Sequence, residues 1–213
     1  MSTNCVEILI NQINLRFNVG SEMTTFLKTE YDVFHIDRDL YIPGYIFFIE
    51  GGAMKTTDES STSLMAGSAT HYAYVEGVGS QARFYIILSF LQLSTNQVLI
   101  AETFNHCLRS LNRATNQTGQ YAGTCRHRGN QDGLNALLNV PRTLINGVKN
   151  PGHVLISEWD GIIKTTNTTN KNISYFGTVG RTAYKIIQSL ETGDFFATVE
   201  HAVGIISYRM KIF

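Results

Sequence analysis

The feature that most restricts the fold of this 213-residue chain is an internal repeat. Three landmarks each return 56 residues later: Val98–Glu102 as Val154–Glu158, Ala66-Gly67 as Ala122-Gly123, and Glu76-Gly77 as Asp132-Gly133. Three landmarks at one offset indicate two copies of one structural unit between residues 66 and 178. Such units bury their apolar faces against their neighbours, so the sequence predicts an array of similar units.

Two fainter copies flank this pair. Phe195–Glu200 repeats the pattern of a strand followed by glutamate 42 residues after Glu158, and residues 39–67 hold a similar apolar pattern. We therefore predict one domain with repeats at approximately 31–65, 66–121, 122–178 and 179–213.

Each unit reads as a set of short strands. In the clearest copy, Val98–Ala101, His106–Arg109 and Gly119–Ala122 are separated by turns that contain Asn and Gly, as in antiparallel hairpins. Apolar residues do not recur at the three- and four-residue spacing of a helix. Four short strands in units of this length predict an all-β fold, a β-propeller of four-stranded antiparallel blades with about four blades.

The segment from Val98 to Arg109 closely resembles the NHL repeat, named after its Asn-His-Leu core. The likeness continues at Tyr121–Thr124, Asp132-Gly133, Ala136 and Pro141. The copy at 154–178 departs from it, since Asp160–Lys164 stands where Asn-His is expected. NHL repeats occur in propellers of tripartite-motif proteins, teneurins and many extracellular animal proteins. The resemblance therefore implies a propeller, in a family that usually has about six blades.

Two arrangements of the ring follow. In the first, residues 1–30 supply a strand that completes the last blade and closes a four-bladed ring. In the second, the chain forms part of a larger propeller. Ser2–Leu9 loosely echoes Phe104–Leu108, as if the chain began inside a blade, and closure is favoured because the chain ends just after the strand-like segment Val203–Phe213. A closed ring leaves no exposed sheet edge, whereas an open arc would leave edges for self-association with a second chain.

Composition disfavours several classes of function. Seventeen basic residues balance seventeen acidic ones, and only 16% of residues are charged, so the chain lacks the basic field that nucleic-acid or anionic-membrane binding needs. The longest apolar run, Phe84–Leu91, is far shorter than the roughly 20 residues of a membrane span. The N-terminus has no basic segment leading into an apolar one, so no signal peptide is expected in this chain.

Three acidic residues occupy equivalent places in the repeats, namely Glu102, Glu158 and Glu200. They would suit a metal or catalytic site if they converged near an axis. A structural role is the stronger interpretation, in which each carboxylate accepts backbone hydrogen bonds in the following turn. No histidine pair has metal-ligand spacing, and His106 is expected to be a packing residue. We predict no catalytic residue, no metal and no cofactor.

Cys107 and Cys125 lie nine residues on either side of Asn116, the expected centre of a hairpin turn. Directly opposed residues are close enough for a disulfide, which would stabilise the blade by about 3 kcal/mol. Extracellular members of the NHL family carry similar cysteine pairs. The alternative is two buried thiols in a reducing compartment, and Cys5 is left as a free thiol or a link to another chain.

Three glycosylation sequons, at Asn116, Asn167 and Asn172, fall in predicted turns. Together with the expected disulfide they favour an extracellular or secreted protein. A cytoplasmic location is the alternative.

Two loops carry candidate partner-binding residues. Arg126 and Arg128 form the only local basic cluster, and Tyr72 and Tyr74 occupy the corresponding loop of the preceding unit. Exposed tyrosines and arginines are common anchors of interfaces. We predict a non-catalytic propeller that binds or scaffolds a protein or glycan partner.

The resemblance implies two alternatives to this function. One is a lyase or lactonase that holds a metal in its central channel, as related propellers do. The other is an RNA-binding propeller, which one basic tripeptide on a neutral chain supports only weakly.

Overall fold

The computed structural model describes residues 6–9, 12–19, 22–58, 60–147, 152–180, 182–188, 195–199 and 206–210. In these ranges nearly all regular structure is β-strand. The helices described there are two short 3₁₀ segments, η1 (Gly79–Gln81) and η2 (Thr103–Asn105). Within the described ranges no helix is long and apolar enough to cross a membrane.

The described strands form five antiparallel sheets. The first contains β1 (Val6–Leu9), β2 (Gln12–Val19) and β3 (Glu22–Lys28). The second contains β4 (Val33–Arg38), β5 (Ile46–Glu50), β6 (Gly52–Thr57) and β7 (Thr62–Ser68). The third contains β8 (Ile87–Ser94), β9 (Gln97–Glu102), β10 (Cys107–Asn112) and β11 (Gln117–Ala122).

The fourth sheet contains β12 (Pro141–Asn146), β13 (His153–Glu158), β14 (Ile162–Asn167) and β15 (Ile173–Thr178). The fifth contains β16 (Ala183–Gln188), β17 (Phe195–Val199) and β18 (Ile206–Met210). In every sheet, strands that follow one another in the sequence are hydrogen-bonded neighbours. This blade order confirms the predicted all-β propeller fold of antiparallel blades.

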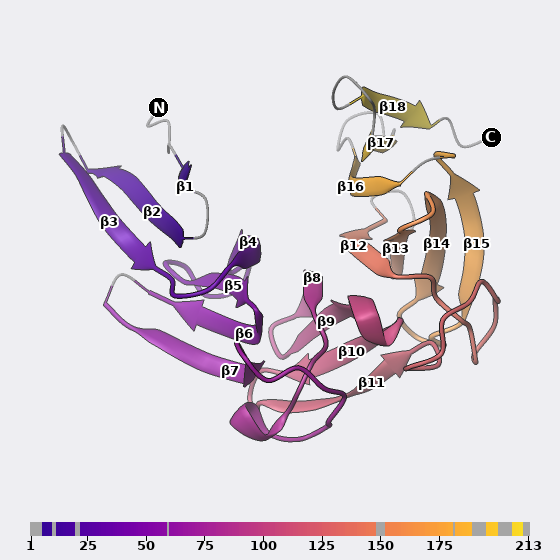
Figure 1. Ribbon diagram of the computed structural model, residues 1–213, viewed down its shortest axis with the longest axis horizontal. Coiled ribbons are helices and arrows are strands. Elements are labelled where there is room, and N and C mark those ends of the chain that lie inside the picture. The colour runs from indigo at the N-terminus through magenta and orange to yellow at the C-terminus, as the bar shows by residue number, and fades with distance from the viewer. Residues whose placement is uncertain are drawn as a thin grey trace.

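The sheets follow one another along an arc, with β4, β8, β12 and β16 on its inner side (Figure 1). Apolar side chains fill the spaces between the second and third, the third and fourth, and the fourth and fifth sheets. In β9, Val98 and Ile100 pack toward the second sheet, whereas Leu99 and Ala101 pack toward the fourth. Side chains alternate between the two faces of a strand, and here both faces are buried. This explains why the run Val98–Ala101 is apolar throughout.

The same packing recurs in the next copy of the repeat. In β13, Val154 and Ile156 lie in the core shared with the third sheet, and Leu155 packs with Ile163 and Ile186 toward the fifth. The segments that share the 56-residue offset, Val98–Glu102 and Val154–Glu158, are thus equivalent second strands. The repeat in the sequence therefore records burial between blades.

Each sheet has two ends with different connections. The links between first and second strands and between third and fourth strands lie at one end, which we call the hairpin face. The links between second and third strands, together with the segments that enter each first strand, lie at the other end, which we call the entry face. Loops that are distant in the sequence therefore meet on the entry face.

Two predictions of domain layout differ from the structure. The boundary placed at residue 66 falls inside β7, the last strand of the second sheet, because the repeated Ala-Gly pair ends a fourth strand and does not begin a blade. The described strands of residues 1–30 form a sheet of their own and do not add a strand to β16–β18. The alternation of Ile13, Leu15 and Phe17 lets this segment form its own hairpins, so it does not close the last blade.

Candidate partner-binding face

Glutamates end the second strands of three sheets, at Glu50, Glu102 and Glu158. Each carboxylate accepts a hydrogen bond from the backbone of the segment that enters the first strand of its own blade. The donors are Tyr31 N for Glu50 at 3.0 Å, Tyr85 N for Glu102 at 2.9 Å and Asn139 N for Glu158 at 2.7 Å.

The glutamates therefore accept backbone hydrogen bonds as expected, but from a different segment of the chain. The backbone donors precede their glutamates by 17 to 20 residues, instead of following them in the next turn. Each glutamate thus fixes the start of its blade on the entry face. Glu50 was not predicted, although Phe48-Ile49-Glu50 shows the same strand-then-glutamate pattern. Glu200 lies outside the described residues.

In each of these three sheets, a basic residue occupies the same position of the third strand. Lys55, Arg109 and Lys164 lie directly opposite Phe48, Ile100 and Ile156, two residues before each glutamate. Lys55 forms an ion pair with Glu50. Arg109 forms one with Glu102 at 2.9 Å, and both side chains are fully buried. These three residues cannot be singled out from the sequence, because their pairing depends on strand register.

The third copy pairs differently. Lys164 is also fully buried, but its ammonium donates to Asp132 Oδ1 at 3.1 Å and to the carbonyls of Gln131 and Leu137. One carboxylate oxygen of Glu158, Oε2, is buried without a hydrogen-bond partner. Lys164 therefore pairs with Asp132, whereas its counterparts Lys55 and Arg109 pair with the glutamates of their own blades.

The pKa values of the three glutamates follow these environments. Burial acts to raise the pKa of Glu50, but Lys55 and the backbone donors hold it below its ordinary value. Burial raises the pKa of Glu102, opposed by Arg109 and by Asn105. Burial raises the pKa of Glu158 to about 7, and the nearby carboxylates Asp160 and Asp132 add to this effect.

Tyr74 stacks between two arginines. Its ring centroid lies 4.6 Å from the guanidinium carbon of buried Arg109 and 5.3 Å from that of Arg126. Its hydroxyl donates to Glu76 at 3.2 Å. The structure thus brings together two of the four predicted partner-binding residues, Tyr74 and Arg126, but uses the half-buried Tyr74 ring mainly to seat the loop on the blade.

A disulfide joins Cys107 and Cys125, with their Cα atoms 4.8 Å apart. The predicted bond is confirmed, but its setting differs from a pair of opposed strand residues. The β10–β11 ladder runs from Asn112 opposite Gln117 to Leu108 opposite Ala122, so the turn centres one to two residues before Asn116. Cys125 lies beyond the end of β11, and the bond fastens the loop that carries Arg126 and Arg128 onto β10.

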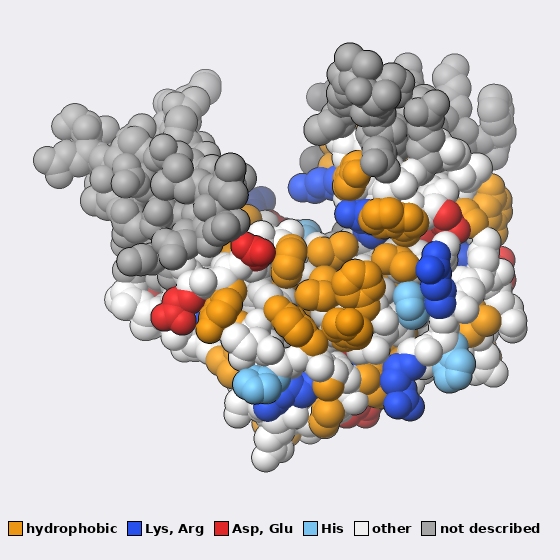
Figure 2. All heavy atoms as spheres, viewed as in Figure 1, with side chains coloured by type: hydrophobic (Ala, Val, Ile, Leu, Met, Phe, Trp, Pro, Cys, Tyr) orange, Lys and Arg blue, Asp and Glu red, His pale blue; other side chains and the backbone are white. Residues whose placement is uncertain are grey.

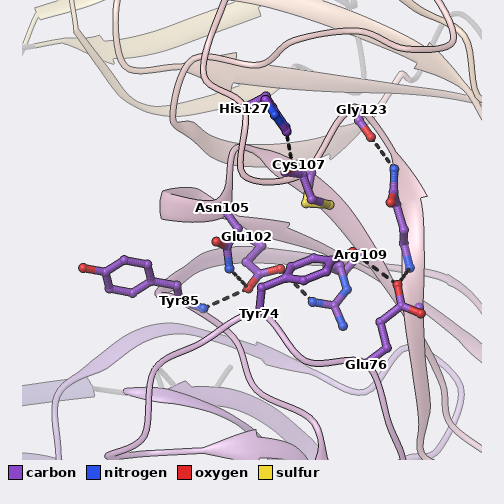
Figure 3. Close-up of a disulfide and its surroundings, with 12 residues drawn as sticks. Tyr74, Glu76, Tyr85, Glu102, Asn105, Cys107, Arg109, Gly123 and His127 are labelled. Atoms are coloured by element: carbon purple, nitrogen blue, oxygen red, sulfur yellow. Dashed lines mark hydrogen bonds and ion pairs between the residues drawn. A yellow bond between two sulfur atoms is a disulfide. The ribbon is translucent and has the colours of Figure 1, made fainter.

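Asn105 joins two loops of the entry face. Its carbonyl accepts a hydrogen bond from Arg126 N at 2.7 Å, and its side-chain amide donates to Glu102 and to the carbonyl of Ala73. Figure 3 shows Tyr74, Glu102, Asn105 and Arg109 grouped beside the disulfide. The loop that carries the tyrosines is thereby tied to the loop that carries the arginines.

His106 also has a structural role. It adopts a left-handed conformation with φ of 56°, which ends the η2 turn, and its Nδ1 accepts a hydrogen bond from Val140 N at 3.3 Å. Burial and the neighbouring Arg128 lower the pKa of His106, so the neutral ring that can accept this bond is favoured. The Asn105-His106 pair of the repeat thus positions the start of the next blade.

An exposed aromatic row, defined as Tyr72, Tyr85 and Phe104, lies on this face. The ring centroids of Tyr72 and Tyr85 are 6.2 Å apart, and those of Tyr85 and Phe104 are 5.4 Å apart. Between 45% and 49% of each residue is exposed. Figure 2 shows hydrophobic side chains gathered over the middle of the visible face. Tyr72 was predicted to bind a partner, whereas Tyr85 was concealed within the apolar run Phe84–Leu91.

A second aromatic group lies at the start of the fourth and fifth sheets. The guanidinium carbon of Arg142 lies 4.8 Å from the ring centroids of both Trp159 and Tyr184. Arg128, which is exposed, donates through Nε to Asn139 Oδ1 at 2.6 Å. This bond ties Arg128 to the segment that enters β12.

The three sequons lie on the hairpin face, in the connections between third and fourth strands. Asn172 is exposed, whereas Asn116 and Asn167 are half-buried. The side chain of Asn167 also accepts hydrogen bonds from Thr169 N and Asn170 N. Glycosylation at these asparagines stays a prediction, with Asn172 the best exposed of the three.

In the described part of the chain, no group of three or more His, Cys, Asp or Glu side chains could hold a metal ion. Glu50, Glu102 and Glu158 each belong to their own blade, so they do not form one cluster. The absence of catalysis stays a prediction.

No known family model matches the sequence, and no curated protein matches it either. Several solved structures share its fold. The WD40 β-propeller domain of Doa1 has a TM-score of 0.61 and 5% identity over 97% of this chain and 63% of that chain. A chain of the nidogen–laminin complex has a TM-score of 0.60 and 9% identity over 91% of this chain and 65% of its own length.

An auxiliary nutrient binding protein from Bacteroides thetaiotaomicron is also similar, with a TM-score of 0.52 and 17% identity. The match covers 78% of this chain and 43% of that one. The present chain thus spans less than two thirds of each of these three solved chains. These likenesses establish the propeller fold alone, and membership of the NHL family stays a prediction.

Proposed function

We propose that this chain is a non-catalytic, NHL-type propeller that binds a protein partner through its entry face in an extracellular setting. The observation that carries the proposal is the aromatic row, because its three rings, with Tyr85 next to both Tyr72 and Phe104, remain about half exposed. Tyrosine, phenylalanine and arginine are enriched in protein interfaces, and buried tyrosine and arginine anchors carry much of their binding free energy.

The loops of this face are held in place before binding. The disulfide and the backbone bond from Arg126 to Asn105 fasten the arginine loop, while the stack of Tyr74 on Arg109 fastens the tyrosine loop. Ordering loops costs free energy when a complex forms, so a surface ordered in advance binds more tightly. Arg126 and Arg128 lie on the loop that is tied to Asn105, the neighbour of Phe104, and would supply polar anchors at the rim.

The placement of the sequons is consistent with this use of the entry face. Glycans on Asn116, Asn167 or Asn172 would lie on the hairpin face and leave the aromatic row uncovered. A disulfide also suits an oxidising compartment. Two of the structurally similar proteins are, by their names, a nutrient binding protein and a participant in a laminin complex. They support a binding role without naming this chain's partner.

A panel of purified extracellular proteins, immobilised beside a glycan array, tests the proposal. The chain from a secretory host and its Tyr85→Ser and Phe104→Ser variants would be compared by surface plasmon resonance. We expect one protein partner whose affinity falls about tenfold or more in each variant, as for residues at the centre of an interface. Arg126→Ala and Arg128→Ala should have smaller effects, mainly on the association rate.

Tyr175→Ser is the matched control, because Tyr175 is 55% exposed but lies on the outer strand β15. This variant should bind as the unmodified chain does. Equal binding by all the variants would overturn the assignment of the face. Row-dependent binding to glycans instead of proteins would keep the face and overturn the partner class.

A further inference from the structure

A cavity of about 270 Å³ lies on the inner side of the arc. Its walls come from the first strands β4, β8, β12 and β16, which belong to four consecutive sheets. Figure 1 shows these strands side by side around the centre. The cavity is separate from the aromatic row, whose members do not line it.

Hydrogen bonds fix the walls of the cavity. Thr143 Oγ1 donates to the carbonyl of Tyr184 at 3.2 Å and joins β12 to β16. Ser89 Oγ accepts from Leu144 N at 3.1 Å and joins β8 to β12. The ring of His35 lies 4.6 Å from that of Phe90, which places β4 against β8. The cavity is therefore formed by the ordered scaffold and not by loops.

The charge of the lining is one-sided. Lys185 and His35 line the cavity, and none of its lining residues is a carboxylate. No ion pair joins Lys185 to a described acidic residue. Burial lowers the pKa of His35, as does the charge of Lys185, while Asp37 and the carbonyl of Leu88 oppose this. Lys185 is therefore the cation of this lining that has no ion-pair partner among the described acidic residues.

The remaining lining is largely apolar and comes from Val33, Phe34, Ile36 and Leu88. Pockets for drug-sized ligands measure roughly 300 to 1,000 Å³, so this one suits a smaller molecule. A cation beside apolar walls fits a ligand that joins an anionic group to a hydrocarbon body. We propose that the cavity binds a small organic carboxylic acid, whose carboxylate pairs with Lys185 and whose hydrocarbon part contacts Val33, Ile36 and Leu88.

Titration of the purified chain with benzoate, followed by isothermal calorimetry and by NMR shifts of the amides of β4 and β16, tests this proposal. Benzamide serves as the neutral isostere and inorganic phosphate as an anion without a hydrocarbon body. We expect benzoate to bind with a dissociation constant of about 1 mM or below. Lys185→Met should weaken it about tenfold or more, as for a hydrogen bond to a charged group, and Lys185→Arg should retain most of the affinity.

Three results would overturn the proposal. They are equal binding of benzamide and benzoate, unchanged benzoate binding by Lys185→Met with the fold intact by circular dichroism, and absence of benzoate binding to the unmodified chain. Phosphate binding as tightly as benzoate would exclude the role of the apolar walls. None of these results depends on the aromatic row, since Tyr85→Ser should bind benzoate normally. The two proposals can therefore fail separately.

Discussion

The third and fourth sheets carry the same glutamate and a basic residue at the same register, yet they use these charges in opposite ways. In the third sheet, Arg109 pairs with Glu102 in a fully buried ion pair. In the fourth, Lys164 pairs with Asp132, which is 46% exposed, and Glu158 keeps one buried oxygen unpartnered.

Two related acids explain the difference. Glu76 and Asp132 share the 56-residue offset, and each accepts a backbone hydrogen bond from the fourth strand of its blade, at Gln120 and Tyr175. Asp132 also accepts a hydrogen bond from the ammonium of Lys164, whereas Glu76 accepts one from the hydroxyl of Tyr74. A neighbour in the preceding loop thus decides whether a buried glutamate is paired.

The largest expected effect comes from removing the cation of the third sheet. Arg109→Met would leave Glu102 buried without its ion-pair partner, which typically costs about 3 to 5 kcal/mol. It would also remove the stack under Tyr74. Urea denaturation would measure the free energy of unfolding.

Lys164→Met is the comparison variant and should cost less, because Asp132 can be solvated once its partner is lost. The double variant E102Q/R109M should recover part of the stability lost in Arg109→Met. An equal loss of stability in Arg109→Met and Lys164→Met would mean that the two blades do not differ in the way described.

The disulfide distinguishes the same two blades, because it fastens the link that leaves the third sheet. Replacing Cys107 and Cys125 together by serine should destabilise the protein by about 3 kcal/mol in the chain-entropy treatment of an 18-residue loop. Amide hydrogen exchange should rise at residues 124–128 and stay unchanged at residues 159–161. Faster exchange at both places would instead indicate general loosening of the entry face.

The unpartnered glutamate should give the molecule a pH-dependent stability. The pKa of Glu158 is about 7 in the folded chain against an ordinary value of 4.5. The folded state therefore holds a proton that the unfolded state releases, and stability falls as pH rises from about 4.5 to about 7. Between about pH 5 and about pH 8 this loss amounts to about 2 to 3 kcal/mol.

Glu158→Gln should remove most of this dependence and stabilise the protein at the higher pH, as measured by thermal denaturation in a series of buffers. Asp132→Asn sharpens the test, because it removes the competing acid for Lys164 and so should lower the pKa of Glu158. A Glu158→Gln profile that matches the unmodified protein would contradict the assignment.

Much of the fold could be predicted from local patterns. The apolar run in Val98–Ala101 and its copy marked strands buried on both faces, and the Asn- and Gly-containing turns marked hairpins. Of the candidate face, Tyr72, Tyr74, Arg126 and Arg128 could be chosen by residue type and loop position. Tyr85 and Phe104 could not, since an exposed ring next to a buried strand looks like core in the sequence.

By itself the sequence determined the repeated strands, the propeller class and the two cysteines that bond, because these depend on residues close along the chain or on their period. The tertiary structure alone decided which cation each glutamate receives. It also decided which loops meet on the entry face and which side chains line the inner cavity. These contacts join segments from different sheets, so they depend on register and on the packing between blades, neither of which is encoded by spacing.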